Sequence, residues 1–330
     1  MGSIVQQHPL SQRPTYNDDQ LSTYVALINP DPSYSLAKLR SEIQENPLAA
    51  LSTLQLRQIA AVHWGNVALH YSHHRTLALD PDSLFHKIVE RKFGGYCMEN
   101  NAFFSTILRS LGYQIYVSGA RISNALMGHA DPDGFAGWQH EVILVIIDGQ
   151  KYLVDVGLGG GCPVHPIPLD KSTSQSYDTT PGSSVRVVRR NIASHTTDQQ
   201  VWVLELSNTT TNTWSAAYCF TEVEWLPQDF EIINFNTSQS PRSWFTYRVI
   251  LVRLVIDEET RTKALGSIML MDHKFERRLG DGKKELLLEA KTEEERVQGL
   301  RQWFGIILRP EEERGIRALA SEIRGAPPGS

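Results

Sequence analysis

The sequence predicts an α+β protein of several domains, with an N-terminal helical bundle, a central antiparallel β-barrel and a C-terminal α/β region. Three observations support this fold class. Apolar residues recur at helical spacing in the first third of the chain, short β-branched and aromatic runs fill the middle, and strands mix with helices near the end. These changes of pattern predict domains over residues 1–112, 113–230 and 231–330.

Four helices are expected in the first domain. Residues 33–47 and 54–72 carry apolar side chains at helical spacing, and residues 80–92 begin with Asp and Ser residues that suit a helix start. The fourth helix covers residues 97–111 and stops at a glycine. Residues 1–20, rich in Gln and Pro, are expected to form an arm or a loop.

The barrel strands are expected between clusters of turn residues, over 113–122, 140–147, 150–156, 184–190, 201–207 and 214–220. The C-terminal domain should contain strands over 243–255 and 263–271 and a hairpin that turns at residues 280–282. Two helices should follow, the first of them capped by Thr292. The last residues, 325–330, are expected to be disordered.

Composition argues against several classes of function. The net charge is -5 and no dense basic run is present, so a nucleic-acid partner is not expected. Three widely spaced cysteines argue against a disulfide framework or a zinc site and indicate a reducing cytosol. No stretch approaches 18 apolar residues, and the N-terminus lacks a signal peptide pattern, so no membrane association is expected. A monomer or weak dimer is expected, because no apolar stripe is left over once the core faces are assigned.

The stretch RKFGGYCMENN, residues 91–101, places one of the cysteines just after a pair of glycines. Glycines allow the backbone to approach a neighbour closely, and the residues after Cys97 favour a helix. A cysteine at a helix start has its thiolate stabilised by unpaired N–H groups and by the helix dipole. Cys97 is therefore a candidate nucleophile, and the alternative is a buried thiol at a helix start.

The segment WQHEVILVIIDGQKYLVDV contains two apolar runs on either side of an Asp-Gly pair, which is a strong signal for a β-hairpin. We expect Ile147 to pair with Gln150 across this turn. In that register His140 and Asp155 lie on the same face as diagonal neighbours, within reach of each other's side chains. A four-residue loop would preserve this arrangement, whereas a three-residue loop would place them on opposite faces.

Cys97, His140 and Asp155 form a candidate catalytic triad. A histidine held by a carboxylate can take the proton of a thiol and keep the cation that forms, so a thiolate–imidazolium pair is expected. Because such a triad serves any acyl transfer, a papain-like or transglutaminase-like cysteine hydrolase is one alternative. A buried thiol, a core histidine and an aspartate beside a turn are another.

The residues GGYCMENN resemble the signature of the arylamine N-acetyltransferases, commonly R-G-G-x-C-x-E-x-N. The stretches GWQHEVILV and YLVDVGLG are similar to that family's histidine and aspartate strands, in the same order, and the resemblance is dense over residues 80–170. It implies a cysteine-protease-like core with a C-terminal α/β lid. It also implies Cys97 as the nucleophile, His140 as the base and Asp155 as its orienting partner.

The resemblance further implies an arylamine N-acetyltransferase with no bound cofactor, which takes acetyl-CoA or another acyl-CoA as co-substrate. A Cys97 acyl-thioester would pass its acyl group to an arylamine or arylhydrazine in a ping-pong reaction, with a role in xenobiotic detoxification. Acetyl, malonyl and propionyl donors stay open. A non-catalytic relative that binds a small aromatic ligand is disfavoured by the intact triad.

Other residues are carried over from the same resemblance. Asn101 would support the aspartate or the active-site loop. Gly137, in the glycine-containing approach to the histidine, is a candidate contact for CoA. Ser243 and Phe245 occupy the last two positions of a segment similar to T-S-P-x-S-x-F, which touches CoA in the family.

Two positions depart from the family pattern. Leu158 stands where the family often has a phenylalanine in the acceptor pocket, so the preference for the acceptor is expected to differ. Phe93 replaces the arginine before the glycine pair, which puts the ion-pair support of that corner in doubt.

Overall fold

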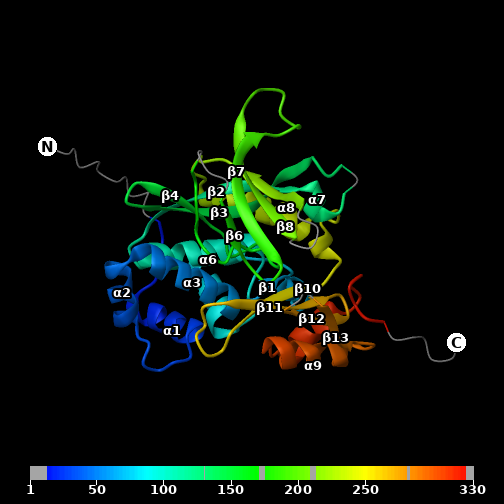
Figure 1. Ribbon diagram of the computed structural model, residues 1–330. Helices are drawn as coiled ribbons and strands as arrows, with labels where there is room; N and C mark the ends of the chain where they lie inside the picture. The colour runs from blue at the N-terminus through cyan, green and yellow to red at the C-terminus, as the bar shows by residue number, and fades with distance from the viewer. Residues whose placement is uncertain (1–12, 130, 171–174, 209–212, 281–282, 325–330) are drawn as a thin grey trace, which may run out of the picture.

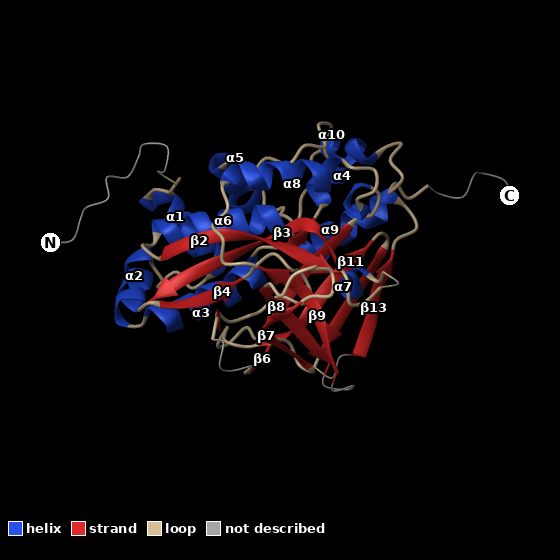
Figure 2. Ribbon diagram, turned by 90° about the horizontal axis from the view of Figure 1, so that it is seen from above, coloured by secondary structure: helices blue, strands red, loops and turns tan. Residues whose placement is uncertain are grey.

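The computed structural model describes residues 13–129, 131–170, 175–208, 213–280 and 283–324. Helices from the first third of the chain pack beside a large antiparallel sheet, and a second sheet with a C-terminal helix forms the third part of the molecule (Figure 1). Seen from above, most helices gather on one side of the larger sheet (Figure 2). The predicted α+β fold class is confirmed.

The N-terminal helices are α1 (Asp18–Ile28), α2 (Leu36–Glu45), α3 (Pro47–Ala61), α4 (Val67–His70), α5 (Pro81–Phe85) with a π-helical turn over His86–Glu90, and α6 (Cys97–Ser110). Helix α1 was not predicted. It begins because Asn17 accepts a hydrogen bond from the backbone N–H of Gln20, and it buries Tyr24 and Ile28 against the other helices. In the described part of the chain, no helix is long and apolar enough to cross a membrane.

The helix expected over residues 54–72 is interrupted: α3 ends at Ala61, and helix returns only in the short α4. Between the two, the chain forms strand β1 (Trp64–Gly65), which pairs antiparallel with the distant β10 (Ile250–Ile256). Gly65 allows this pairing, because a Cβ there would lie 2.3 Å from a backbone oxygen of β10. Helical spacing is a local signal, and pairing with a distant strand overrides it here.

The larger sheet contains β2 (Gln114–Ser123), β3 (Phe135–Ile147), β4 (Gln150–Val154), β5 (Ile167–Pro168), β6 (Ser176–Asp178), β7 (Ser183–Asn191), β8 (Gln200–Asn208) and β9 (Thr213–Phe220). Its strand order is β5-β4-β3-β2-β9-β8-β7-β6, and a short helix, α7 (Asn124–Met127), lies between β2 and β3. All six predicted barrel strands are present. The predicted hairpin register is confirmed as well, because Ile147 pairs with Gln150.

The third part of the molecule contains β10, β11 (Ala264–Met271), β12 (Lys274–Leu279), β13 (Lys283–Glu289), α9 (Glu293–Phe304) and α10 (Pro310–Glu313). The strand order of its sheet is β1-β10-β11-β12-β13. The predicted hairpin joins β12 to β13, but residues 281–282 of its turn, like the tail 325–330, lie outside the described residues. Thr292 caps α9 as predicted, by accepting a hydrogen bond from the backbone N–H of Glu295.

Two features before this sheet differ from expectation. Helix α8 (Pro227–Gln239) was not predicted, and the expected domain limit after residue 230 lies within it. The strand expected over 243–255 begins only at β10, because Trp244–Thr246 form a 3₁₀ turn. The expected limit after residue 112 falls between α6 and β2.

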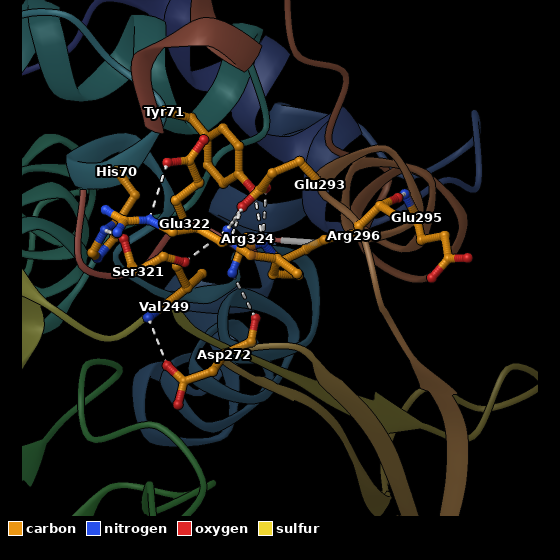
Figure 3. Close-up of polar contacts among 12 residues, drawn as sticks. His70, Tyr71, Val249, Asp272, Glu293, Glu295, Arg296, Ser321, Glu322 and Arg324 are labelled. Carbon is orange, nitrogen blue, oxygen red and sulfur yellow. Dashed lines mark hydrogen bonds and ion pairs between the residues drawn. The ribbon is translucent and has the colours of Figure 1, made fainter. Parts of the chain in front are cut away.

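Arg296 of α9 is fully buried and joins several segments of the C-terminal region (Figure 3). Its guanidinium donates hydrogen bonds to the hydroxyl of Tyr71 (2.8 Å) and to the carbonyl oxygens of Asp272 (2.9 Å) and Ser321 (3.0 Å). It also forms an ion pair with Glu293. One side chain thereby connects α9, the turn between β11 and β12, the segment after α10 and the residue that follows α4.

Candidate active site

Cys97 is the first residue of α6 and is only 6% exposed. The chain turns into this helix through Gly94, which has φ +64 and lies so close to the His63 carbonyl that a Cβ would be 2.1 Å from its oxygen. The Cys97 Sγ lies 3.5 Å from the carbonyl oxygen of Gln139 on β3. The thiol therefore sits between the N-terminus of α6, where backbone N–H groups lack helical partners, and the edge of the barrel.

His140 on β3 and Asp155 directly after β4 are both buried, and the Nε2 of His140 lies 2.8 Å from Oδ2 of Asp155. The confirmed register of the β3–β4 hairpin produces this contact. Cys97 lies beside this pair, because its Sγ is 3.5 Å from the carbonyl oxygen of Gln139, the residue before His140, and both Cys97 and His140 line the same cavity. The structure thus brings Cys97, His140 and Asp155 together.

Asn101, one turn along α6 from Cys97, holds Asp155 in place. Its Nδ2 donates to Oδ1 of Asp155 (3.0 Å) and to the carbonyl oxygen of Glu141 (2.6 Å). Its Oδ1 accepts a hydrogen bond from the backbone N–H of Val156 (2.9 Å). Because Asn101 is fully buried, these bonds fix α6, β3 and the loop after β4 relative to one another.

Gly157 lets the loop after β4 pass directly over the start of α6. Its backbone N–H donates to Oδ1 of Asp155 (2.7 Å). A Cβ at this position would lie 2.8 Å from both the Cα and the carbonyl oxygen of Cys97, and 2.7 Å from Nδ2 of Asn101. Only a glycine fits there without a shift of the backbone.

The His140–Asp155 pair favours its charged form. Burial disfavours an imidazolium, but the charge and hydrogen bond of Asp155 and the nearby Cys97 outweigh it and raise the pKa of His140. Burial likewise disfavours a carboxylate, yet the His140 charge and the hydrogen bonds to Asp155 hold the pKa of Asp155 below its usual value. The imidazole is therefore oriented and able to hold a proton.

The other two cysteines are poor candidates for a nucleophile. Burial raises the pKa of Cys162 well above its usual value, and the charge of Asp155 adds to this effect. Burial raises the pKa of Cys219 to about 11. Both therefore remain protonated thiols at neutral pH, and the sulfur of Cys162 accepts a hydrogen bond from the backbone N–H of Leu158 (3.0 Å).

A cavity of about 1030 Å³ opens beside Cys97 and His140. Its apolar lining comprises Trp64, Ile122, Leu126, Met127, Leu158, Leu206, Trp244, Phe245, Tyr247, Ile250, Val252, Met269 and Met271. Its cationic lining comprises Arg242, Arg248, Arg277, Arg278 and Lys284. The cavity thus combines an apolar interior suited to a flat ring with cations suited to an anionic ligand.

Of the four residues expected to contact substrates, three line the cavity and one does not. Leu158, Ser243 and Phe245 line the cavity. Gly137 is exposed on β3 and is not among the residues that line it, and a Cβ there would meet no neighbouring atom within 4 Å. A ligand in the cavity would therefore reach the first three residues directly.

Several lining residues were not anticipated from the sequence. The cations of β12 and β13, such as Arg277 and Lys284, and the methionines of β11, such as Met269, reach the cavity only because the second sheet packs against the barrel. No local signal predicts that packing. The Ser-Pro-Arg-Ser segment around Arg242 was the one available clue in the sequence.

Phe93 stands where the resemblance would place an arginine, and other contacts hold this corner of the structure. Phe93 is buried in the core of the third part of the molecule, and the Arg91 guanidinium lies 4.5 Å from its ring centre. Arg91 also forms an ion pair with Glu312 (2.9 Å). The buried carboxylate at this corner, Glu99, pairs with Lys87 of the π-helical turn.

Comparison with known proteins gives a consistent result. The sequence model of the N-acetyltransferase family matches residues 47–313. The N-malonyltransferase FDB2 of Fusarium pseudograminearum (strain CS3096) is 35% identical over 322 residues, which cover 92% of this chain and 93% of that protein. The arylamine N-acetyltransferase of Escherichia coli (strain K12) is 28% identical over 186 residues, 56% of this chain and 59% of that protein.

Solved structures agree with this match. The arylamine N-acetyltransferase of Mycobacterium marinum in complex with CoA has a TM-score of 0.70 at 23% identity, covering 91% of this chain and 99% of that chain. The enzyme of Nocardia farcinica has a TM-score of 0.70 at 25% identity, covering 93% and 98%. The family match, the identity to curated relatives and the shared fold together show that the chain is an acyltransferase and belongs to the arylamine N-acetyltransferase family.

Proposed function

We propose that the protein transfers an acyl group from acyl-CoA to the nitrogen of an aromatic amine or hydrazine through a thioester on Cys97. The observation that carries this proposal is the placement of Cys97 and His140, with Asp155 behind them, at the wall of an open cavity. His140 is held by Asp155 and lies next to the thiol, as a base for a nucleophile requires.

In the first half-reaction the Cys97 sulfur attacks the thioester carbonyl of the donor. The carbonyl oxygen becomes an oxyanion, and the backbone N–H of Cys97 at the start of α6 is the nearest candidate donor to stabilise it. The carbon–sulfur bond to CoA then breaks, and the imidazolium of His140 supplies the proton that CoA takes. An acyl-thioester on Cys97 and a neutral His140 remain.

In the second half-reaction the amine nitrogen attacks that thioester. His140, now neutral, takes the proton that the nitrogen loses, and the Cys97 sulfur leaves as the amide forms. Asp155 orients the imidazole in both steps, with Asn101 holding the carboxylate. The first half-reaction transfers the imidazolium proton to CoA, and the second restores it to His140 from the amine.

The two kinds of cavity lining are assigned to the two substrates. Arg242, Arg248 and Arg278, with their neighbours, would face the phosphate groups of the acyl-CoA, since guanidinium groups suit phosphate oxygens. The apolar wall that includes Leu158 and Trp64 would hold the ring of the acceptor.

Malonyl-CoA is the donor that we propose, in preference to acetyl-CoA or propionyl-CoA. The support is the extent of the match: the relative named N-malonyltransferase is aligned over 92% of this chain, and the curated acetyltransferase of Escherichia coli over 56%. We also propose a cytosolic enzyme that detoxifies aromatic amines as a monomer or weak dimer. All three cysteines are free and buried, which suits a reducing compartment, and one chain supplies the whole site.

We propose that the three expected domains divide these tasks. The helical domain carries Cys97 and the barrel carries His140 and Asp155, while the third domain closes the cavity. We propose that the limit between the second and third domains lies after β9, because the expected limit at residue 230 would divide α8.

Intact-protein mass spectrometry tests the proposed function. The wild-type protein and the Cys97→Ala variant are each mixed with malonyl-CoA, acetyl-CoA or propionyl-CoA in the absence of amine. A single added malonyl group on the wild type alone, lost when an arylamine is added and recovered as the malonylated amine, is the expected result.

Two other results would contradict parts of this proposal. An acetyl adduct that forms faster than the malonyl adduct would overturn the choice of donor. The absence of any adduct, in a folded protein that cleaves esters or amides without CoA, would favour the cysteine hydrolase.

A further inference from the structure

A buried ion pair joins Glu99, in the first turn of the helix that carries Cys97, to Lys87 of the preceding π-helical turn. The Glu99 side chain has no solvent exposure, and the Lys87 side chain is only 16% exposed. The Nζ of Lys87 donates to Oε1 of Glu99. The Lys87 ammonium therefore compensates the charge of a carboxylate that has no access to solvent.

Glu99 in turn fixes the backbone on which Cys97 stands. Its Oε2 accepts a hydrogen bond from the backbone N–H of Tyr96 (3.1 Å), the residue just before Cys97. Gly95 packs so closely on the carboxylate side chain that a Cβ would lie 2.6 Å from the Cβ of Glu99. The turn into α6 is therefore built around this one carboxylate.

Lys87 also holds the same loop through its main chain. Its carbonyl oxygen accepts a hydrogen bond from the backbone N–H of Phe93 (3.1 Å). Lys87 lies in the π-helical turn His86–Glu90, which ends where the N–H of Arg91 donates to the carbonyl oxygen of His86 (2.9 Å). The loop between this turn and α6 is thus bonded to Lys87 at both ends, at Phe93 directly and at Tyr96 through Glu99.

We propose that Lys87 is a positioning residue for the Cys97 nucleophile, which it orients and electrostatically balances through Glu99. This inference rests on the proposed function, in which Cys97 attacks the acyl donor. Lys87 touches neither substrate nor the sulfur. It acts by compensating the charge of Glu99 and holding its carboxylate against the backbone N–H of Tyr96, so that the first turn of α6 presents the thiol and the N–H of Cys97 in a fixed geometry.

The electrostatic part of this role has a definite sign. A negative charge two residues from the thiol opposes thiolate formation, and the Lys87 cation cancels it. The other titratable groups around Cys97 are His140 and Asp155 of the barrel, Cys162 of the loop after β4 and the adjacent Tyr96. Replacing Lys87 or Glu99 changes none of these side chains, and Tyr96 stays neutral because burial, with a smaller contribution from the charge of Glu99, raises its pKa well above its usual value.

The experiment compares wild type, Lys87→Met, Lys87→Arg, Glu99→Gln and the double variant Lys87→Met/Glu99→Gln. The readouts are the pH dependence of Cys97 alkylation by iodoacetamide and the single-turnover rate of acylation by the acyl-CoA that labels the wild type. Lys151→Met is the matched control. It breaks a Lys–Glu pair of similar geometry (2.6 Å to Glu222) on the barrel.

In Lys87→Met the midpoint of the alkylation profile should rise by about one pH unit, and acylation should slow by roughly ten- to a hundredfold. In Glu99→Gln the midpoint should fall, because Lys87 is left unbalanced. The double variant and Lys87→Arg should lie close to the wild type, since both restore charge balance. Lys151→Met should have the profile of the wild type.

An unchanged profile in Lys87→Met, or a double variant whose rate equals the product of the two single effects, would overturn the proposal. If Lys87→Met does not fold, Glu99→Gln is compared with the double variant, which differs from it only by the loss of Lys87. The alkylation midpoint of the double variant must then be higher than that of Glu99→Gln. The alkylation arm needs no acyl-CoA. A wild type that forms no acyl adduct would therefore contradict the proposed function, while the alkylation profiles still decide the role of Lys87.

Discussion

At the scale of single residues, His140 and Asp155 depend on each other for their charges. Both are buried, so each would lose its charge if it stood alone in this environment. The pair instead raises the pKa of His140 and lowers that of Asp155. In the proposed mechanism His140 passes a proton to CoA. That proton is held by the His140–Asp155 contact, which also stabilises the fold.

The stabilisation from this pair should depend on pH. The unfolded chain loses the histidine proton near its ordinary pKa of about 6.5, whereas folded His140 keeps it to higher pH. The contribution is full below about 6.5 and is lost as the pH rises toward the raised pKa of the folded state. Above 6.5 the free energy of unfolding due to the pair should fall by up to about 1.4 kcal/mol per pH unit.

Urea unfolding from pH 6 to pH 9 measures this effect. Cys97→Ala serves as the reference, so that the thiol does not titrate, and is compared with the triple variant that adds His140→Gln and Asp155→Asn. The difference in free energy of unfolding should shrink as the pH rises. A difference that stays constant over this range would contradict the assigned charges.

At the scale of secondary-structure elements, the site is the meeting point of the α6 N-terminus with the β3–β4 hairpin. The β3–β4 ladder is regular, whereas the β2–β3 ladder shifts register beside His140, and the contacts of the site depend on how far α6 lies from this hairpin. Gly157 sets that separation, because its Cα faces the backbone of Cys97 with no room for a Cβ.

Gly157→Ala should therefore destabilise the protein by about 1–3 kcal/mol, since backbone atoms of α6 must move to admit the methyl group. The same displacement should slow acylation of Cys97. Gly160→Ala is the control for stability, because its Cβ would meet no atom within 4 Å and its free energy of unfolding should change by less than about 0.5 kcal/mol. Chemical denaturation measures the free energy of unfolding of both variants. Equal values would show that the loop after β4 can move to admit the methyl group at position 157.

At the scale of the whole molecule, the C-terminal region depends on the buried Arg296. The hydrogen bonds of this side chain reach Tyr71, just after α4, as well as Asp272 and Ser321 (Figure 3). The contacts continue toward the cavity, because His70 links the Ser321 hydroxyl (2.8 Å) to the carbonyl oxygen of Phe245 (3.0 Å). The C-terminal segment is therefore coupled to the cavity wall.

Arg296→Met should lower the free energy of unfolding by about 3–5 kcal/mol, because it leaves the partners of a buried charge unsatisfied. Arg40→Met is the control, since Arg40 forms an exposed pair with Asp18 (2.7 Å) whose loss should change the free energy of unfolding far less. Denaturant unfolding of the two variants gives the comparison. Similar losses in both would contradict a central role for Arg296.

The parts of the molecule that sequence predicts are those encoded by neighbouring residues. The β3–β4 hairpin is one, because a two-residue turn and two apolar runs define its register and place His140 beside Asp155. The start of α6 at Cys97 is another. Strand β1 and the cationic wall near Arg277 could not be predicted, because both depend on contacts between segments far apart in the chain.

The groups assigned to bond breaking and the cations assigned to the acyl-CoA occupy separate stretches of the chain. The first fall between Cys97 and Asp155, and the second between Arg242 and Lys284. A gene for such a protein can accumulate substitutions in its last third and acquire new substrates while its chemistry is inherited unchanged. Duplicated copies should therefore diverge first in what they accept, and only later, if at all, in the reaction they perform.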